Sequence, residues 1–311
     1  MLKPKPEIPI EVDGQKVGLR YYFLAPFNTS DHTSAILFVH GIRTSAMYFQ
    51  PLAKCLAQYG YHGIALEYPG YDQENWGASS VLEPFTIPVF AHYIHQALKM
   101  LSNKYKIGLE NWIIWGHSMG GAVVHNAVKQ YPATFGRTAY IVLEAPAFAN
   151  YLTFGTKAAI HLGQLMRNLK LGSMIGCSII RIYYTRRVLL SEPLNDHKFT
   201  IEGHCDSHYI LDANINSIRH PANNFDVTTF ESIGLNKLIW IWSTDDIILH
   251  APPPDTIPKN QQVQLKTSHD ISSTAPKLVC DAFLSRFSPY KTVLIYTISP
   301  RPNPTYIADS K

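Results

Sequence analysis

The sequence lacks the features of a nucleic-acid-binding or membrane-spanning protein. Only 16% of its 311 residues are charged, the formal net charge is +4, and no basic run is long enough to follow a phosphate backbone. No clean apolar stretch has the length that a transmembrane helix needs. Internal repeats and low-complexity tracts are also missing. These absences predict a globular protein with no nucleic-acid partner.

Cysteine is scarce as well. There are four, and they are widely separated: Cys55, Cys177, Cys205 and Cys280. None forms a C-x-x-C pair, which argues against a structural zinc site, and we expect buried free thiols in a reducing compartment. The first seven residues lack the apolar segment of a secretory signal. A cytoplasmic protein is therefore expected, with export by a route that needs no signal as the alternative.

A strand–serine–helix pattern is the most informative feature that is present. Residues 116–121 (Gly-His-Ser-Met-Gly-Gly) follow the apolar run 112–115 and precede a helix-like segment at 122–128. A tight turn of this kind strains the serine backbone and exposes the hydroxyl above the sheet, and it needs small neighbours such as the flanking glycines. Ser118 is therefore a candidate nucleophile, and the amide of Met119 forms half of an oxyanion hole. The alternative is a solvated serine in a small-residue turn.

Strand-like and helix-like segments alternate on both sides of this turn. We expect strands at 17–24, 35–39, 63–68, 112–115, 140–144, 237–242 and 263–265, and helices at 48–58, 85–105, 122–128 and 276–287. Such alternation predicts an α/β protein with a mostly parallel central sheet flanked by helices. Residues 292–296 in the tail are a further candidate, for an edge strand.

The alternation stops between about Ala149 and Leu235. This stretch contains helical pieces but no strand of the same character. The simplest organisation is one sheet domain with an inserted, mainly helical lid. Residues 1–148 then form the first part of the core, 149–235 the lid, and 236–311 the second part of the core with the tail.

A serine hydroxyl needs a base to become nucleophilic, and His269 is the candidate. It follows the strand at 263–265 and lies just before the last helix. A solvated loop histidine is the alternative interpretation. Three other histidines are weaker candidates for the base: His250, His204 and His208. His125, on the helix after the serine, is expected to be packed or solvated.

The base in turn needs a carboxylate that orients it, and Asp246 is the candidate. It follows the strand at 237–242, so it lies at the carboxyl end of that strand. Asp246 is preferred to Asp245 because it sits further into the turn, directly before two isoleucines. Glu144, at the end of another strand, is a third possible acid. Along the chain, Ser118 comes first, then Asp246, then His269. This order of nucleophile, acid and base is typical of folds in which the serine sits in a strand–turn–helix segment.

The second half of the oxyanion hole is expected in the loop after residues 35–39. Gly41 permits a sharp turn that aims the amide of Ile42 at the hole, and His40 supports the loop by hydrogen bonds. A role for His40 as a second general base is the less favoured alternative.

Taken together, these segments resemble the α/β-hydrolase superfamily, most closely its lipase, esterase and lysophospholipase-like branch. The matching pieces are His40-Gly41, residues 67–71 (Glu-Tyr-Pro-Gly-Tyr), residues 116–121, Asp246 and His269. The resemblance implies acylation of the serine by an ester or thioester, followed by hydrolysis. Neither a cofactor nor a metal ion is expected.

The chain departs from the family pattern at three places. Residues 42–44 (Ile-Arg-Thr) replace a small-residue run and would narrow the pocket, Glu67-Tyr68 stands where an aspartate is common, and Ser243 replaces a glycine at the acid turn. None of the three removes a catalytic group. A serine at position 118, where the dehalogenase and epoxide-hydrolase relatives carry an aspartate, argues against those activities.

The expected lid mixes basic and apolar residues. Between 151 and 200 the basic residues are Lys157, Arg167, Lys170, Arg181, Arg186, Arg187 and Lys198. An amphipathic basic lid over an apolar pocket would suit lipid-like acyl chains, anionic headgroups or coenzyme-A thioesters, with peripheral contact to an anionic membrane. An ordinary lid helix with a solvated basic face is the alternative.

The leading hypothesis is a serine carboxyl-ester hydrolase that acts on a small-molecule acyl ester or a lipid-like substrate. Thioesterase and amidase or peptidase activities remain open, because the same residues serve all of them. A hypothesis from a different class is a ligand-binding receptor that keeps the fold without turnover.

Overall fold

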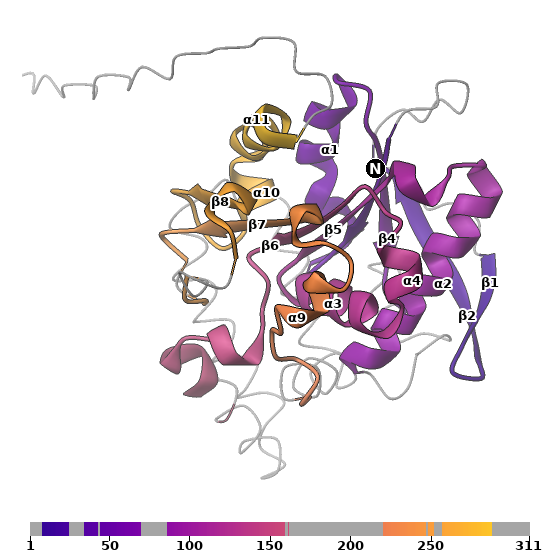
Figure 1. The fold of residues 1–311 in the computed structure, drawn as a ribbon, viewed down its shortest axis with the longest axis horizontal. Helices are drawn as coiled ribbons and strands as arrows, with labels where there is room; N and C mark the ends of the chain where they lie inside the picture. The colour runs from indigo at the N-terminus through magenta and orange to yellow at the C-terminus, as the bar shows by residue number, and fades with distance from the viewer. Residues whose placement is uncertain are drawn as a thin grey trace, which may run out of the picture.

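In the computed structural model, an eight-stranded sheet forms the centre of the fold (Figure 1). The structure describes residues 8–24, 34–42, 44–69, 86–158, 161, 220–246, 248–251 and 257–287. The strands are β1 (Ile8–Val12), β2 (Gln15–Phe23), β3 (Ala35–Val39), β4 (His62–Glu67), β5 (Trp112–His117), β6 (Tyr140–Glu144), β7 (Leu238–Ser243) and β8 (Gln262–Leu265). Their order across the sheet is β1-β2-β4-β3-β5-β6-β7-β8. β2 pairs antiparallel with β1 and β4, and the remaining pairs are parallel, so the predicted mostly parallel sheet is confirmed.

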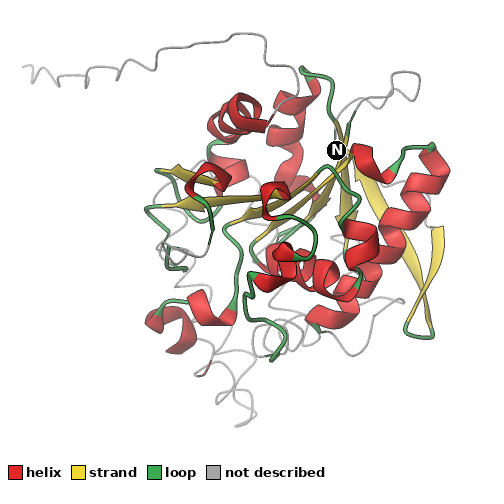
Figure 2. Cartoon of the chain, in the orientation of Figure 1, coloured by secondary structure: helices red, strands yellow, loops and turns green. Residues whose placement is uncertain are grey.

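Helices cover both faces of the sheet (Figure 2). The longer ones are α1 (Gln50–Ala57), α2 (Ile87–Tyr105), α3 (Met119–Gln130) and α11 (Pro276–Phe287). The short ones are η1 (Ala46–Phe49), η2 (Leu109–Asn111), α4 (Pro132–Phe135), η3 (Ala149–Tyr151), α9 (Thr228–Glu231), η4 (Leu235–Lys237), η5 (Lys259–Gln261) and α10 (Ile271–Thr274). In Figure 1, α1, α10 and α11 lie on one side of the sheet, and α2, α3, α4 and α9 lie on the other.

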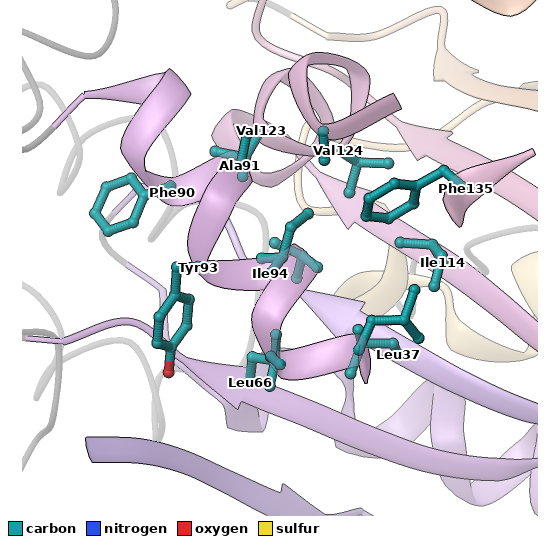
Figure 3. Packing of buried hydrophobic residues seen from close by; sticks show 14 of the residues in the cluster. Leu37, Leu66, Phe90, Ala91, Tyr93, Ile94, Ile114, Val123, Val124 and Phe135 are labelled. Carbon is teal, nitrogen blue, oxygen red and sulfur yellow. The ribbon is translucent and has the colours of Figure 1, made fainter. Parts of the chain in front are cut away.

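The central strands are apolar throughout because both of their faces are covered. On β3, for example, Leu37 packs into the core on the α2–α3 side, whereas Phe38 packs into the core on the α1–α11 side. Figure 3 shows Leu37 and Ile114 of the sheet beside Ile94 of α2 on the first of these sides. Successive side chains of one strand therefore pack into two separate cores, one on each face of the sheet.

The first residue of the predicted lid, 149–235, contacts a residue in its last part beside the sheet. The amide of Ala149 donates to the carbonyl of Asn223 at 2.8 Å, and β6 and β7 pair in parallel on either side of the insertion. The two expected core parts, 1–148 and 236–311, therefore contribute to one sheet. Residues 162–219 lie outside the described residues, so the lid itself stays a prediction, as does the edge strand expected at 292–296.

The strand order determines where a ligand can bind. From β3 the chain passes through α1 to β4 on one side, whereas β5, the other neighbour of β3, leads on to β6 on the opposite side. The helices that follow these two strands, α1 and α3, pack on opposite faces of the sheet, and α/β proteins commonly place their ligand sites at such a point of the sheet. The residues predicted from sequence for the site follow the carboxyl ends of β3, β5, β7 and β8.

The expectation of free thiols is wrong for two of the four cysteines. Cys55 on α1 and Cys280 on α11 form a disulfide, with their Cα atoms 6.3 Å apart. They are 225 positions apart in sequence, but α1 and α11 pack against each other on the same face of the sheet. The argument from cysteine for a reducing compartment therefore does not hold for this pair. Cys177 and Cys205 lie outside the described residues.

Removing this disulfide should destabilise the fold. A bridge that closes so long a loop restricts the unfolded chain, and its loss typically costs about 2–4 kcal/mol. We expect the Cys55→Ser/Cys280→Ser variant to unfold at a lower urea concentration than wild type, and dithiothreitol to shift wild type in the same direction. The double variant, whose midpoint should not respond to dithiothreitol, is the control. An unchanged midpoint in the variant would contradict the prediction.

The described ranges contain neither a membrane-spanning helix nor a metal centre. None of their helices combines the length and the hydropathy needed to cross a bilayer. Likewise, no group of three or more His, Cys, Asp or Glu side chains among these residues could hold a metal ion.

Candidate active site

Ser118 occupies a sharp turn between β5 and α3. Its backbone has φ 53° and ψ −120°, a conformation that residues other than glycine adopt rarely and at a cost of about 1–3 kcal/mol. Hydrogen bonds to the end of β6 hold it there, because the Ser118 amide donates to the Glu144 carbonyl at 2.9 Å and the Ala147 amide donates to the Ser118 carbonyl at 2.9 Å. The strained turn predicted from sequence is therefore present.

The two glycines that flank this serine have no room for a side chain. A Cβ on Gly116 would lie 2.5 Å from the carbonyl oxygen of Gly120, and one on Gly120 would lie 2.1 Å from the carbonyl oxygen of Val39. Both obstacles are backbone atoms, which cannot move aside without distorting the sheet. The need for small residues at these positions is confirmed.

His269 lies beside Ser118 although 151 positions separate them. Its Nε2 atom is 3.0 Å from the Oγ atom of Ser118, which is hydrogen-bond distance. The loop between β8 and α10 carries the ring. The two side chains expected to act as base and nucleophile are thus brought together.

Asp246 meets the other nitrogen of the same ring. Its Oδ2 atom is 2.7 Å from Nδ1 of His269, and its Oδ1 atom accepts the amides of Ile248 at 2.8 Å and Leu249 at 3.0 Å. Both carboxylate oxygens are therefore engaged. Asp245 is exposed and accepts a bond from its neighbour Thr244, so the structure favours Asp246 over Asp245 as the partner of the histidine.

Burial and mutual contact shift the pKa values of the pair in opposite directions. Burial lowers the pKa of His269, but the charge and hydrogen bond of Asp246, with smaller contributions from the charges of Asp270 and Glu144, leave the pKa raised above its usual value. Burial raises the pKa of Asp246, but the His269 ring and the two amides outweigh it and leave the pKa lowered. Side-chain exposure is only 11% for His269 and 4% for Asp246, so water screens the contact weakly. The arrangement favours an imidazolium next to a carboxylate.

The loop after β3 runs directly alongside the serine. A Cβ on Gly41 would lie 2.9 Å from the Cβ of Ser118, and Val39 pairs in register with Gly116. Met119 is the first residue of α3, so its amide has no acceptor within the helix. Both elements that carry the expected oxyanion amides, Ile42 and Met119, therefore adjoin Ser118. Donation from these two amides to a substrate oxygen stays a prediction.

His40 contacts the carboxylate of Glu67, a residue for which the sequence predicts no role of its own. Its Nε2 atom is 2.8 Å from Oε1 of Glu67, and its Nδ1 atom is 2.9 Å from the carbonyl oxygen of Gly41. Because β3 and β4 run parallel in register, the residues that follow Val39 and Leu66 become neighbours. The expected support of the Gly41 loop by His40 agrees with these contacts. The signal for Glu67 was an acid at the end of an otherwise apolar strand.

Glu144, the third possible acid, is engaged elsewhere. Its carboxylate is fully buried and accepts bonds from Trp115 Nε1 at 2.7 Å, Tyr48 Oη at 3.0 Å, and Ser272 through the amide at 2.8 Å and Oγ at 2.5 Å. Burial raises its pKa, although these hydrogen bonds oppose the shift. Tyr48 and Ser272 lie in no recognisable sequence motif, so their contacts with Glu144 could not be predicted from the sequence.

The remaining candidate histidines do not reach Ser118 through any contact in the described residues. His250 is exposed. His125 is fully buried, and its Nε2 atom lies 3.1 Å from the carbonyl oxygen of Asp226, among the rings of Phe148 and Phe230. Of the two expectations for His125, packed or solvated, the structure shows the packed one. His204 and His208 lie outside the described residues.

This geometry can support nucleophilic attack by an alcohol. A hydroxyl lies within hydrogen-bond distance of a ring nitrogen, and a buried carboxylate holds the opposite nitrogen of that ring. An alcohol in such a relay can lose its proton as it bonds to an electrophilic carbon.

Curated relatives match parts of the chain. A protein of Mycoplasma pneumoniae named "Putative esterase/lipase 3" is 31% identical over 120 residues, 38% of this chain and 39% of that protein. A protein of Mycobacterium phage D29 named "Putative non-heme haloperoxidase" is 25% identical over 175 residues, 53% of this chain and 55% of that protein. The chain thus spans about half or less of the length of these relatives.

Solved structures and a family model extend the comparison. The crystal structure of carboxylesterase CesB from Bacillus subtilis has a TM-score of 0.56 and 15% identity, covering 92% of both chains, and at that identity it shows the fold alone. The family model described as serine aminopeptidase, S33, matches residues 30–209, which is more than half of the chain. With the strand order and the serine turn described above, this match makes the chain a member of the α/β-hydrolase superfamily, in the family described as serine aminopeptidase, S33.

Proposed function

We propose that the chain is a serine hydrolase that cleaves carboxylic esters through an acyl-enzyme intermediate. The observation that carries the proposal is the position of the His269 ring, with Nε2 at 3.0 Å from Ser118 Oγ and Nδ1 at 2.7 Å from Asp246 Oδ2. A ring held from both sides in this way can accept the serine proton and stay aligned while it carries a positive charge.

Acylation begins with attack of Ser118 Oγ on the ester carbonyl carbon. Nε2 of His269 takes the hydroxyl proton as the new C–O bond forms, and the carbonyl oxygen becomes an anion. The amides of Ile42 and Met119 would donate to that oxygen. When the carbonyl re-forms, the bond to the leaving alcohol breaks, and His269 gives its proton to the departing oxygen. The products of this half are the free alcohol and acyl-Ser118.

Deacylation repeats the same steps with water. His269 removes a proton from the water molecule as its oxygen bonds to the acyl carbon, and the second oxyanion uses the same two amides. Collapse breaks the bond to Ser118 Oγ, which recovers its proton from His269. The acid is released and the enzyme returns to its starting state. The Asp246 carboxylate stabilises the imidazolium in both halves, in agreement with the raised pKa of His269.

An ester is the preferred substrate class, and an amide is the second candidate. The ester is favoured by the sequence pattern and by the printed name of the relative from Mycoplasma pneumoniae. The amide has one observation in its favour, the description of the family model as a serine aminopeptidase. Both bonds would be cleaved by the same attack, and they differ in whether His269 protonates an oxygen or a nitrogen.

Lipid-like substrates and contact with an anionic membrane remain proposals from the sequence of the expected lid. Of the basic residues named there, Lys157 lies within the described residues and is exposed. The other six, between Arg167 and Lys198, lie outside them.

A fluorophosphonate probe tests the proposed nucleophile, and a substrate panel tests the bond. We expect the probe to label wild-type protein at Ser118, as located by peptide mass spectrometry. We also expect turnover of p-nitrophenyl esters in a series from acetate to palmitate, faster than turnover of matched p-nitroanilides. Faster anilide cleavage would favour the amide alternative. A folded protein that resists the probe and cleaves nothing would instead support a ligand-binding module.

A further inference from the structure

Four hydrogen-bond donors converge on a carboxylate that the proposed chemistry does not use. Glu144 has no exposed surface, and its two oxygens accept bonds from Trp115, Tyr48 and, twice, Ser272. Such a carboxylate is costly to desolvate, and removing it alone would leave these donors buried without an acceptor. The cluster therefore fixes the segments that carry the donors around the end of β6.

Ser272 connects the carboxylate to the loop that carries His269. It belongs to α10, which begins two residues after His269, and both its amide and its hydroxyl bind Glu144. The other end of this loop is held at Thr267, whose carbonyl accepts a hydrogen bond from the Ser243 hydroxyl. The segment is thus anchored on β6 at one end and on β7 at the other, with His269 between the anchors.

His117 holds the same loop from the side of the serine. Its Nε2 atom donates to the carbonyl oxygen of His269 at 3.3 Å, and its ring stacks on Tyr48 with centroids 4.2 Å apart. Tyr48 in turn donates to Glu144, so the two contacts belong to one cluster. Burial lowers the pKa of His117, and the nearby His269 lowers it further, which keeps this ring neutral.

We propose that Glu144 and His117 are positioning residues for His269: Glu144 holds the backbone at Ser272, three residues after the base, and His117 holds the carbonyl of the base itself. The inference rests on the proposed function. During turnover the His269 ring must stay aligned with Ser118 and Asp246 while its own charge changes twice. Glu144 and His117 both hold the main chain of this loop, the charge of Glu144 also raises the pKa of His269, and the neutral ring of His117 does not repel the imidazolium. A small displacement of the base would lower the rate of proton transfer and leave substrate binding largely unchanged.

Glu144→Gln tests the carboxylate. In this variant an amide NH₂ group replaces one of the two carboxylate oxygens. That group cannot accept hydrogen bonds, so the anchor at Ser272 is disrupted. We expect kcat to fall by about 10- to 100-fold with KM within about threefold of wild type. Because this variant removes a buried acceptor and can fold poorly, Ser272→Ala is the second test and should lower kcat by about fivefold or more, with KM likewise retained.

Thr138→Val is the matched control for Ser272→Ala. Thr138 is also fully buried, and its hydroxyl donates to the Phe135 carbonyl at 2.7 Å, before β6 and at the opposite end of that strand from Ser118. Both substitutions delete one buried hydroxyl hydrogen bond and should lower the unfolding midpoint similarly. Only Ser272→Ala should lower kcat. Equal loss of kcat in both variants would overturn the proposal.

The His117 contact is tested by rescue. His117→Leu removes the donor to the His269 carbonyl and should lower kcat by about tenfold, whereas His117→Gln keeps an N–H donor and should recover most of that loss. If His117→Leu retains wild-type kcat, or if the glutamine variant is no better than leucine, His117 has no positioning role.

A spectroscopic readout separates this inference from the proposed function. The proton between His269 Nδ1 and Asp246 should give a low-field NMR resonance in wild type, whether or not the protein turns over a tested ester. We expect the resonance to weaken or vanish in Glu144→Gln, Ser272→Ala and His117→Leu, and to persist in Thr138→Val. A wild type that shows the resonance but no probe labelling would contradict the proposed function alone. Unchanged resonance and kcat in all three variants would contradict the positioning roles alone.

Discussion

Replacing Ser118 with alanine is expected to lower kcat by about 10⁵- to 10⁶-fold, the largest effect of any single change. The substitution removes the oxygen that forms the acyl-enzyme, and neither His269 nor Asp246 can replace it. Residual activity would come from the oxyanion amides and from substrate binding. Alanine also lacks a group to hydrogen-bond Nε2 of His269, but it preserves the Cβ that the turn accommodates, so the fold should persist.

The measurement is steady-state hydrolysis of the best p-nitrophenyl ester, together with probe labelling. Ser118→Ala should resist the probe and keep a circular dichroism spectrum and unfolding midpoint close to wild type. Ser285→Ala is the control, since that exposed hydroxyl on α11 donates to the Ala282 carbonyl of its own helix at 3.1 Å. If Ser118→Ala retained a tenth of wild-type activity, the nucleophile would have to be another residue.

Asp246→Asn is expected to lower kcat by about 10⁴-fold. An asparagine can turn its amide N–H₂ toward Nδ1 of His269, because its oxygen is retained by the amides of Ile248 and Leu249. The ring would then carry its proton on Nε2, facing Ser118, and could not accept the serine proton. The loss arises from the wrong tautomer and from an imidazolium without its carboxylate.

The pH profile adds a second signature for Asp246. The base must be neutral to act, so kcat/KM rises as pH increases through the pKa of His269. Asp246 raises that pKa, and its removal should therefore move the rise to lower pH. The matched control is Asp245→Asn, which alters an exposed carboxylate one position away and should leave both kcat and the profile within twofold of wild type. A larger effect from Asp245 than from Asp246 would reverse the assignment of the acid.

Much of the fold follows from the sequence because the strands are short, apolar and well separated. The segment 140–144 was predicted with the bounds of β6, and 276–287 with those of α11. The serine turn could also be predicted, because the tight turn itself requires small residues on both sides of the serine. The candidate site followed from one further rule, that parallel strands deliver the residues after them to a common edge.

The parts that sequence analysis did not predict depend on which distant segments become neighbours. β1 was not expected, and it lies at the edge of the sheet, where Pro9 is tolerated because a missing amide disrupts no central ladder. The partnership of Cys55 with Cys280 needs α1 to pack on α11. The partnership of His40 with Glu67 needs the in-register pairing of β3 with β4. No local pattern carries this information.

Glu144 illustrates the same limit within the site. Its location at the end of an apolar strand made it a candidate acid, and the structure does place it at the carboxyl end of β6. Its role depends on Trp115, Tyr48 and Ser272, which come from β5, η1 and α10. A sequence can place a carboxylate at a strand end, but only the packed structure shows which donors surround it.

The disulfide between α1 and α11 also governs how the molecule responds to a protease. Ser118, Asp246 and His269 all lie in the stretch of chain enclosed by Cys55 and Cys280. A single cut anywhere within that stretch leaves two fragments that remain one covalent species, with nucleophile and base still tethered. Under reducing conditions the same cut leaves the two fragments with no covalent link, and packing alone then holds them together. Whether a nicked molecule stays one covalent species therefore depends on the redox state of its surroundings.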